Sequence, residues 1–246
     1  MKSKKETNHR TLVIIPAFNE EGSLSDVVIR TLRAGFDCLV IDDGSIDKTA
    51  AVGRAAGAYM IQMPFNVGIG GALRCGFKWA VRNGYTSVVQ CDADGQHSPE
   101  LISKLITCRE ESGAHLVIGS RFRESTNYSV GAARGFLMKR MATRASKAAG
   151  ITLTDTTSGF RCISQPLLGE FANNYPVEYM ESFEALIVAA SAGYAMQEVA
   201  CEMSHRVAGI PSNRPVQAAG FTIRVLLGGL LGTRFKIMKF NNQLPT

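Results

Sequence analysis

The sequence lacks the features that mark several common classes of protein. Its six cysteines lie far apart and form no Cys-X-X-Cys pair, which argues against a zinc ribbon or a redox-active dithiol and favours reduced thiols. The net charge is +6, but the basic residues are not interleaved with aromatic ones as in a base-stacking surface. We therefore expect no nucleic-acid partner. No internal repeat or low-complexity tract is visible.

Long hydrophobic runs are also missing. The longest uncharged run of the apolar C-terminal stretch, residues 225–233, is far shorter than the ~20 residues that a membrane-spanning helix needs. Residues 1–10 are polar and lysine-rich without an apolar h-region, so we expect a disordered lead-in rather than a signal peptide. For residues 213–246 we expect an amphipathic element that docks on a membrane or a partner, and a packed terminal helix is the alternative. Four basic residues interrupt this stretch: Arg224, Arg234, Lys236 and Lys239.

What the chain does contain is a regular alternation of strand-like and helical patterns. Apolar, β-branched runs predict strands at residues 11–16, 38–41, 59–61, 115–119 and 195–203, and one that ends at Asp92. Helical spacing of apolar residues and capping residues predict helices at 24–32, 70–82, 132–149 and 178–192, and helices that begin near Asp47 and Ser98. This order predicts an α/β fold with a doubly wound, mostly parallel sheet. We expect one catalytic domain over residues 11–212.

Polar clusters follow three of the predicted strands. They are Asn19–Glu20, Asp42–Asp43 and the pair Asp92 and Asp94. In doubly wound sheets, ligands bind beyond the carboxyl ends of the strands. These three clusters should therefore open onto one crevice.

The Asp92 and Asp94 pair is the most informative of these clusters. Two carboxylates one residue apart at a strand end bring several oxygens within reach of one hard cation. Mg²⁺ or Mn²⁺ is often held by one or two carboxylates together with substrate phosphates. The alternative is an ordinary polar turn, because Asp and Gly are common turn residues. The two aspartates alone do not distinguish a cation site from a turn, and only the motifs around them favour the cation site.

The second half of the chain carries a basic stretch and a polar loop. The helical stretch 132–149 carries five basic residues: Arg134, Lys139, Arg140, Arg144 and Lys147. They form either a solvated face or a cationic wall for an anionic acceptor. Residues 155–161 are rich in small polar residues and end in Arg161. We expect a functional loop there, and Asp155 is the candidate general base should the acceptor be a hydroxyl group.

Taken together, the motifs resemble family 2 glycosyltransferases of the GT-A fold. The matching segments are VIIPAFNE at 13–20, IDDGS at 41–45, NVG with GA at 66–72, and DAD at 92–94. Within that family, DADGQHSPE at 92–100, GSR at 119–121 and SGFR at 158–161 resemble the dolichyl- or polyprenyl-phosphate mannose synthase branch. The resemblance spans roughly residues 12–206 and implies a Rossmann-like nucleotide-binding half.

The resemblance also implies roles for individual residues. The loop that cradles the nucleotide base comprises Pro16, Ala17, Asn19 and Glu20, and Asp43 recognises base or ribose. The metal is held by Asp92, Asp94 and Gln96, and phosphates by Arg121, Arg161 and Arg206. Gly71 and Arg134 complete the donor-binding set, and the catalytic set is Asp92, Asp94, Arg121, Asp155 and Arg161. One departure lies at Arg206, where the serine of the family's Arg-X-X-Gly-X-Ser pattern is displaced by one position, to Ser212.

These residues predict a metal-dependent, inverting transfer of a sugar from a nucleotide diphosphate, GDP- or UDP-linked, to a polyprenyl phosphate. Arginine grips phosphate oxygens in a bidentate manner, and a lipid phosphate is already anionic, so no general base is needed. Alternatives are transfer to a hydroxyl group, a nucleotidyltransferase, or a non-catalytic nucleotide-sugar-binding module. Against a nucleotidyltransferase, no glycine-rich phosphate loop with lysine follows the first predicted strand.

The predicted acceptor also implies a location. We expect a cytoplasmic protein that is peripheral at the inner face of the membrane. It would reach its lipid through the basic helix, the C-terminal element or a small membrane partner protein.

Overall fold

The computed structural model describes residues 10–123, 132–177 and 181–203. The predicted C-terminal element at 213–246, Arg206 and residues 1–9 of the predicted lead-in therefore lie outside the described residues. Arg10, the last residue of that lead-in, is described and forms an ion pair with Asp37. The strands are β1 (Thr11–Ala17), β2 (Asp37–Asp42), β3 (Tyr59–Gln62), β4 (Ser87–Gln90), β5 (Leu116–Ser120), β6 (Arg161–Ser164) and β7 (Met196–Ala200). The helices are α1 (Leu24–Arg33), α2 (Thr49–Ala55), α3 (Ile69–Arg82), α4 (Ile102–Ser112), α5 (Ala132–Ala149), α6 (Leu167–Asn174) and α7 (Glu181–Ser191), with a 3₁₀ turn at Pro99–Leu101.

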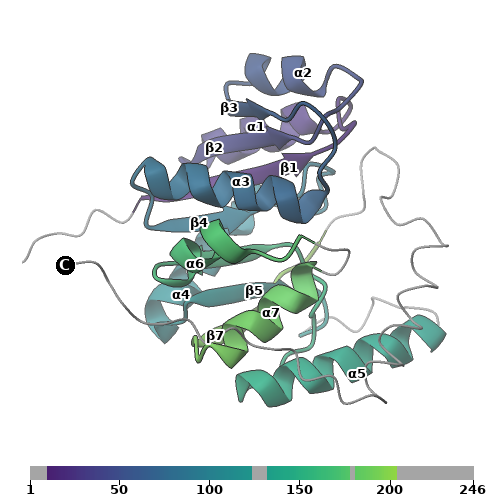
Figure 1. The fold of residues 1–246 in the computed structure, drawn as a ribbon, viewed down its shortest axis with the longest axis vertical. Coiled ribbons are helices and arrows are strands. Elements are labelled where there is room, and N and C mark those ends of the chain that lie inside the picture. The colour runs from purple at the N-terminus through teal and green to yellow at the C-terminus, as the bar shows by residue number, and fades with distance from the viewer. Residues whose placement is uncertain (1–9, 124–131, 178–180, 204–246) are drawn as a thin grey trace, which may run out of the picture. The chain divides into compact units, whose positions relative to one another are not determined.

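The strands form one sheet in the order β3-β2-β1-β4-β6-β5-β7 (Figure 1). Strands β1 to β4 run parallel to one another, and β5 runs parallel to β7. Strand β6 lies antiparallel between β4 and β5. The prediction of a doubly wound, mostly parallel α/β sheet is thereby confirmed.

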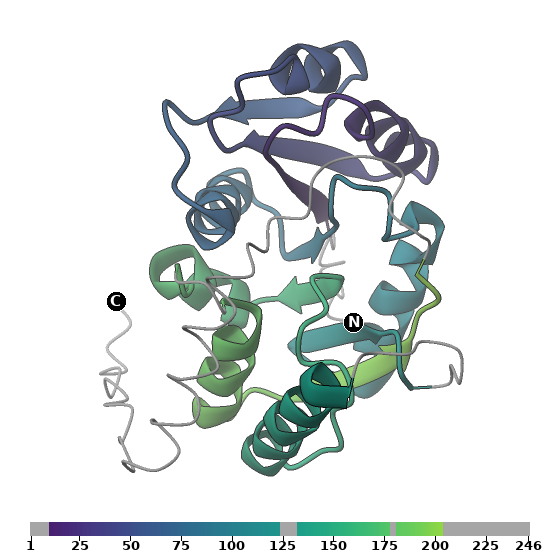
Figure 2. The ribbon, with the colours of Figure 1, turned by 90° about the vertical axis from the view of Figure 1, so that its right-hand side faces the viewer.

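Helices cover both faces of this sheet, as Figure 2 shows. On one face, α3, α6 and α7 bury side chains against the strands around Leu12, Ile14 and Ile163. On the other face, α1 and α4 pack over a second cluster around Val13, Val40 and Cys162. Strand β1 thus alternates its side chains between two cores, which explains why its sequence is apolar at every central position.

Two glycines let α3 approach its neighbours closely. A Cβ at Gly76 would lie 2.8 Å from Ile41 Cδ1 of β2, and one at Gly70 would overlap the backbone oxygen of Pro176. The first glycine brings α3 down onto the sheet. The second brings its N-terminal turn against the segment after α6.

The sequence patterns missed two elements, β6 and α6. Strand β6 begins at Arg161, at the end of the polar loop 155–161, so a charged residue stands where a buried strand starts. Helix α6 has only eight residues, and its burial is decided by contacts with α3 rather than by a long apolar pattern. Both elements depend on tertiary packing.

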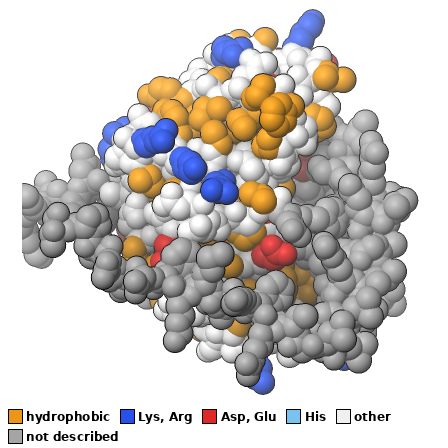
Figure 3. All heavy atoms as spheres, viewed as in Figure 1, with side chains coloured by type: hydrophobic (Ala, Val, Ile, Leu, Met, Phe, Trp, Pro, Cys, Tyr) orange, Lys and Arg blue, Asp and Glu red, His pale blue; other side chains and the backbone are white. Residues whose placement is uncertain are grey.

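The outer face of α3 is basic. Arg74, Lys78 and Arg82 recur every four residues along the helix, and Figure 3 shows a row of basic side chains below a group of apolar ones on this face. Nearby exposed apolar residues include Tyr59 and Val81. Within the part of the chain that the structure describes, no helix is both long and apolar enough to cross a membrane.

Candidate active site at the carboxyl edge of the sheet

The loops after β1 and β2 hold each other in place. The Asn19 backbone N–H donates to Ser45 Oγ at 2.9 Å, and Asn19 Oδ1 accepts the Ile46 N–H at 3.0 Å. Asn19 has a φ of 56°, a left-handed conformation that Asn tolerates better than most residues. The Glu20 N–H donates to Thr49 Oγ1 at 2.8 Å. Asn19 and Glu20, both predicted in the nucleotide-binding set, therefore shape this loop pair.

Asp43 holds the segment that leads into α3. Its two carboxylate oxygens accept the N–H groups of Val67 at 2.8 Å and Gly68 at 2.9 Å. Burial raises the pKa of Asp43 above its ordinary value, although these two bonds lower it, and the neighbouring Asp42 charge raises it further. Asp43 thus places the glycine-rich start of α3, which includes Gly71, beside the crevice.

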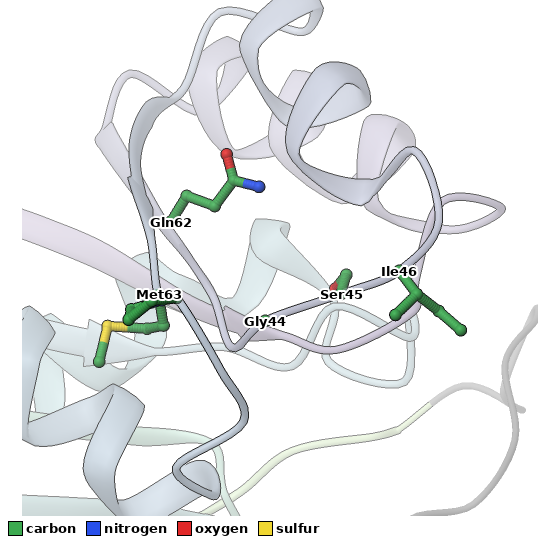
Figure 4. Close-up of a pocket in the computed structure, with 6 residues that line it drawn as sticks. Gly44, Ser45, Ile46, Gln62 and Met63 are labelled. Carbon is green, nitrogen blue, oxygen red and sulfur yellow. The ribbon is translucent and has the colours of Figure 1, made fainter.

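An open pocket of about 500 Å³ lies at the ends of β2 and β3. Figure 4 shows it between the strand that carries Gln62 and Met63 and the loop of Gly44, Ser45 and Ile46. A Cβ at Gly44 would lie 2.6 Å from the backbone carbon of Phe65, so only glycine fits there without a shift of the chain. Pro16 and Ala17 stand at the end of the neighbouring strand β1, where the Ala17 oxygen accepts the Asp43 N–H.

The acidic loop follows β4 directly. Asp92 donates its backbone N–H to His97 Nδ1 at 3.0 Å, and the Gln96 N–H donates to Asp94 Oδ1 at 2.9 Å. Asp94 is 3% exposed, and the Asp92 side chain is one-third exposed. The loop therefore presents Asp92, Asp94 and Gln96, the three predicted metal ligands, within one short turn.

The donor chemistry of this loop fits a divalent cation. Asp92 Oδ1 is buried and has no hydrogen-bond partner among the described residues, which is the state of an oxygen reserved for a ligand. Within that part of the chain, no three His, Cys, Asp or Glu side chains are grouped to hold a cation alone. A cation here would need the Gln96 amide oxygen and phosphate oxygens of a bound nucleotide, as hard cations commonly do.

The loop 155–161 passes directly over Asp92. A Cβ at Gly159 would lie 3.0 Å from Asp92 Oδ1 and 3.2 Å from Gln90 Nε2. Arg161 stands opposite Gln90 in the β4–β6 register and is 1% exposed. Its Nε donates to the Ser158 oxygen at 2.8 Å. In this structure Arg161 therefore organises the loop from inside and does not reach the open crevice.

Arg121 and Asp155 form a bidentate ion pair. Arg121 Nε and Nη2 donate to Asp155 Oδ2 and Oδ1 at 2.6 and 2.7 Å, and Nη2 also donates to Thr157 Oγ1 at 2.8 Å. Burial alone would raise the pKa of Asp155, but the hydrogen bonds and charge of Arg121 lower it below its ordinary value. Asp155 is thus an ionised anchor, which does not suit the role of a general base.

Glu198 of β7 fixes the backbone on which Asp155 stands. Its side chain is fully buried, and its carboxylate accepts the N–H groups of Thr154 and Asp155 at 2.8 to 3.0 Å and the Thr154 hydroxyl at 3.0 Å. The Ser120 and Thr154 hydroxyls are 2.8 Å apart. A chain of hydrogen bonds therefore runs from β7 through Asp155 to Arg121.

A mostly apolar pocket of about 490 Å³ is lined by Phe122, the residue that follows Arg121 in the chain. It lies between α5, which contributes Met138, Lys139 and Ala142, and the segment that carries Leu153. The Arg121 guanidinium lies 5.4 Å from the centre of the Phe122 ring. The phosphate-binding candidate Arg121 and an apolar pocket are therefore adjacent.

The structure places most of the predicted site residues at one edge of the sheet, with two exceptions. Arg206 lies outside the described residues, and Arg134 lies in α5, where its side chain is not described. Sequence reasoning did not identify His97 and Glu198, whose hydrogen bonds organise the site. It also missed Gln90 and Glu181, which are buried near Arg161. Burial raises the pKa of Glu181, while Ser182 and the charge of Arg161 oppose the rise. A charged residue inside an apolar strand, as at Glu198, is the signal that could have revealed one of them.

The fold and the site define an α/β protein with a mostly parallel sheet and an acidic loop at the carboxyl edge of that sheet. The glucosyl-3-phosphoglycerate synthase of Mycobacterium tuberculosis, solved with Mn²⁺, uridine diphosphate and phosphoglyceric acid, matches the chain with a TM-score of 0.66. The match has 22% identity and covers 92% of this chain and 78% of that one. At this identity it shows the GT-A fold alone.

The family follows from the sequence comparison. Residues 12–171 match the model of glycosyl transferase family 2, and the chain belongs to that family. The polyprenol monophosphomannose synthase of Mycolicibacterium smegmatis is 34% identical over 65% of this chain and 63% of its own length. The undecaprenyl-phosphate mannosyltransferase of Micrococcus luteus is 35% identical over 62% of this chain and 65% of its own. The chain thus spans just under two thirds of the length of these two relatives.

A third relative points to a different sugar. The UDP-N-acetylglucosamine–dolichyl-phosphate N-acetylglucosaminyltransferase of Methanococcus voltae is 30% identical over 72% of this chain and 78% of its own length. The predicted resemblance to family 2 and its polyprenyl-phosphate branch is confirmed. The relatives differ in the sugar that their names give, so the similarity leaves the sugar open.

Proposed function

We propose that this protein transfers a sugar, with inversion, from a nucleoside diphosphate sugar to a polyprenyl phosphate, and that it requires Mg²⁺ or Mn²⁺. The observation that carries the proposal is the juxtaposition of two features at one sheet edge. An acidic loop, Asp92 to Gln96, lies under the same 155–161 segment whose Asp155 anchors Arg121. The names of the relatives, all lipid-phosphate sugar transferases, support the same acceptor class.

The donor is assigned to the half of the edge formed by β1, β2 and β3. The interlocked loops at Asn19 and Ser45 and the pocket near Gln62 offer polar and backbone groups for a nucleoside, UDP- or GDP-linked. Asp43 keeps the start of α3 in position next to it. A diphosphate extending from this pocket would run toward the acidic loop, because ligands of such sheets lie across the carboxyl ends of the strands.

Asp92, Asp94 and Gln96 would hold the cation on the diphosphate. When bound, a divalent cation acts as a Lewis acid that stabilises the negative charge on the departing nucleoside diphosphate. The buried Oδ1 of Asp92 has no hydrogen-bond partner among the described residues, so it does not have to leave one in order to bind a cation. The Lewis acidity of the cation and the unpartnered oxygen of Asp92 both suit a mechanism in which the site stabilises charge on the leaving group, without transfer of a proton.

The acceptor phosphate is assigned to Arg121. The guanidinium is fixed by Asp155 and Thr157, so its position beside the apolar pocket is defined. The apolar pocket beside Phe122 would take the first isoprene units of the lipid. A phosphate oxygen is anionic at neutral pH, so it can attack the sugar without losing a proton.

Transfer to a hydroxyl acceptor fits the site less well. That reaction needs a carboxylate that can take a proton. Asp155, the candidate for this role, already accepts both donors of Arg121, and its pKa is lowered. The ion pair therefore favours the lipid phosphate as acceptor.

The lipid acceptor implies work at a membrane surface. We propose that the protein is peripheral at the cytoplasmic face, held by its net charge of +6, by its C-terminal element or by a small membrane partner. This places a water-soluble donor and a lipid-borne acceptor at the same sheet edge.

A transfer assay tests the proposal. Purified protein is incubated with a short polyprenyl phosphate, Mn²⁺ or Mg²⁺, and a panel of UDP- and GDP-linked sugars, and the organic phase is analysed for glycolipid. We expect glycolipid from one donor, loss of product with a chelator, and a loss of at least ~100-fold with Asp94→Asn. The control Asp26→Asn changes an exposed carboxylate of α1 and should leave the rate unchanged. Glycolipid formation that is insensitive to chelator and to Asp94→Asn would contradict the metal assignment.

A further inference from the structure

The acidic loop is closed at its base by one side chain. Asp92 is its first residue and His97 its last, and the Asp92 backbone N–H donates to His97 Nδ1 at 3.0 Å. The Cys91 thiol, one residue before Asp92, lies 3.7 Å from the His97 backbone oxygen. Two contacts with His97, one from Asp92 and one from Cys91, therefore join the start of the loop to its end.

The direction of this hydrogen bond fixes the chemistry of the ring. A backbone N–H can only donate, so Nδ1 must carry a lone pair and the proton of the neutral imidazole stands on Nε2. Nδ1 also lies 3.6 Å from Asp92 Oδ2. With Nδ1 engaged by the N–H group, that nitrogen is an acceptor for the loop and not a ligand for a cation.

The imidazole itself is firmly held. It is 3% exposed and stacks on the ring of Phe160, with 5.0 Å between the ring centres and 23° between the planes. Phe160 is fully buried, and a Cβ at Gly119 of β5 would lie 2.8 Å from its Cδ1. Phe160 packs closely against Gly119 on its other side, so the buried core of the protein sets the position of the His97 ring and of its Nδ1.

The same segment also leaves room for the Asp92 side chain. A Cβ at Gly159, next to Phe160 in the chain, would lie 3.0 Å from Asp92 Oδ1, closer than an ordinary contact. Phe160 therefore supports His97, which binds the Asp92 backbone, while its neighbour Gly159 makes room for the Asp92 carboxylate.

We infer that His97 is a positioning residue for the cation site. It acts through the acceptor at Nδ1, which orients Asp92 and the turn that carries Asp94 and Gln96. This inference rests on the proposed function in that it takes this loop as the cation site. Outer partners of metal ligands are commonly worth a factor of 10 to 100 in metal affinity, so the effect should be measurable.

Three substitutions separate the acceptor from the aromatic ring. His97→Asn places an amide oxygen where Nδ1 stands and removes the ring. His97→Gln places its polar atoms farther out, near Nε2. His97→Phe keeps a ring for stacking on Phe160 and removes the acceptor, which leaves the Asp92 N–H without a partner.

The measurement is a titration of each variant with Mn²⁺, alone and with UDP or GDP, followed by the electron paramagnetic resonance of free Mn²⁺. We expect His97→Phe and His97→Gln to raise the Kd for Mn²⁺ ~10-fold or more, and His97→Asn to stay within ~3-fold of the parent protein. Equal losses in all three variants, or no loss in His97→Phe, would overturn the inference. Melting temperatures measured alongside identify a variant whose loss comes from unfolding.

A second measurement needs no variant. Long-range ¹H–¹⁵N spectra of the parent protein should show His97 with an unprotonated Nδ1 and a protonated Nε2, and slow exchange of the Asp92 amide. The opposite tautomer would contradict the inference. These readouts also separate it from the proposed function: without any lipid transfer, the Mn²⁺ series still tests His97, whereas transfer with an unchanged Mn²⁺ series refutes only the role of His97.

Discussion

At the scale of single residues, the pairing of Arg121 with Asp155 distinguishes between two roles for Asp155, a general base and an anchor for Arg121. A carboxylate at the mouth of a glycosyltransferase site is a natural candidate for a base. Here both of its oxygens accept hydrogen bonds from one guanidinium, and its side chain is completely buried. Asp155 therefore holds Arg121 in place, which supports the proposal that Arg121 binds the acceptor phosphate.

This ion pair predicts a pH-dependent contribution to stability. Although burial acts to raise it, the folded-state pKa of Asp155 lies below the ordinary value of an aspartate, because Arg121 stabilises the charged carboxylate. The stabilisation is therefore fully present above pH ~3.8 and disappears as the pH falls through the lowered value. Arg121→Met leaves the buried carboxylate unpaired and should lower the free energy of unfolding by about 3 kcal/mol at pH 7.

Urea unfolding of the parent protein and the variant between pH 7 and pH 3 checks this prediction. The difference between them should shrink at the acid end. Arg30→Met is the matched control, because Arg30 also forms a bidentate pair, but with the exposed carboxylate of Glu100. That pair should contribute less than about 1 kcal/mol. A loss for Arg121→Met that is the same at every pH would contradict the assignment.

Gly159 makes a second prediction at this scale. In Gly159→Ala the added Cβ would lie 3.0 Å from Asp92 Oδ1, closer than most real Cβ contacts. The Asp92 carboxylate would have to move away from the added methyl group, and we expect the metal-dependent transfer rate to fall ~10-fold or more, with little change in melting temperature. Gly169→Ala is the control, since its Cβ would meet only the flexible Gln165 side chain, at 3.1 Å. An unchanged rate in Gly159→Ala would contradict a role for the Asp92 carboxylate in this position.

At the scale of elements, strand β7 contacts the site through the side chain of Glu198. Glu198 accepts hydrogen bonds from three donor groups of the Thr154–Asp155 segment. In Glu198→Gln one acceptor becomes an NH₂ group that faces backbone donors. We expect a loss of roughly 1–3 kcal/mol and a lower transfer rate, because Arg121 is held by the same segment.

Calorimetric melting temperatures together with transfer rates check the Glu198 prediction. A loss of this size should lower the melting temperature by several degrees in a chain of this length. Glu202→Gln, at an exposed position just beyond β7, is the control and should change neither value. A Glu198→Gln variant that melts earlier but transfers at the parent rate would separate β7 from the acceptor site.

Several elements were predictable because their signals are local. Strands β1, β2 and β5 are apolar on both faces, and α1 and α3 carry apolar residues at helical spacing; α5 was predicted with the same bounds that the structure gives. Strand β6 was missed because it starts with a buried arginine. Its place between β4 and β5 is set by pairing partners more than 40 residues away in the sequence.

The candidate site divides in the same way. Asp92, Asp94 and Gln96 were predicted because they are neighbours in the sequence, and parallel strands must end at one edge. The pairing of Arg121 with Asp155, 34 residues later, depends on how the sheet brings two loops together. The acceptor role of His97 depends on one hydrogen-bond direction. No local pattern encodes either.

At the scale of the whole molecule, the net charge of +6 suits a surface of anionic lipids. We expect the protein to sediment with vesicles that contain anionic phospholipid at low salt and to be released largely by ~0.5 M salt, because screening weakens such attraction. Vesicles of zwitterionic lipid are the control and should retain little protein. Equal binding to both kinds of vesicle would point to apolar anchoring or to a membrane partner.

The most direct test compares two acceptors that differ in one group. A polyprenyl phosphate and the corresponding polyprenol are offered with the same donor sugar and Mn²⁺, and the glycolipid products are separated by mass. We predict that only the phosphate is glycosylated, because the proposed acceptor site at Arg121 takes an anion and Asp155 is held in the ion pair with Arg121. Transfer to the polyprenol at a comparable rate would contradict this and would require a base that the ion pair does not supply.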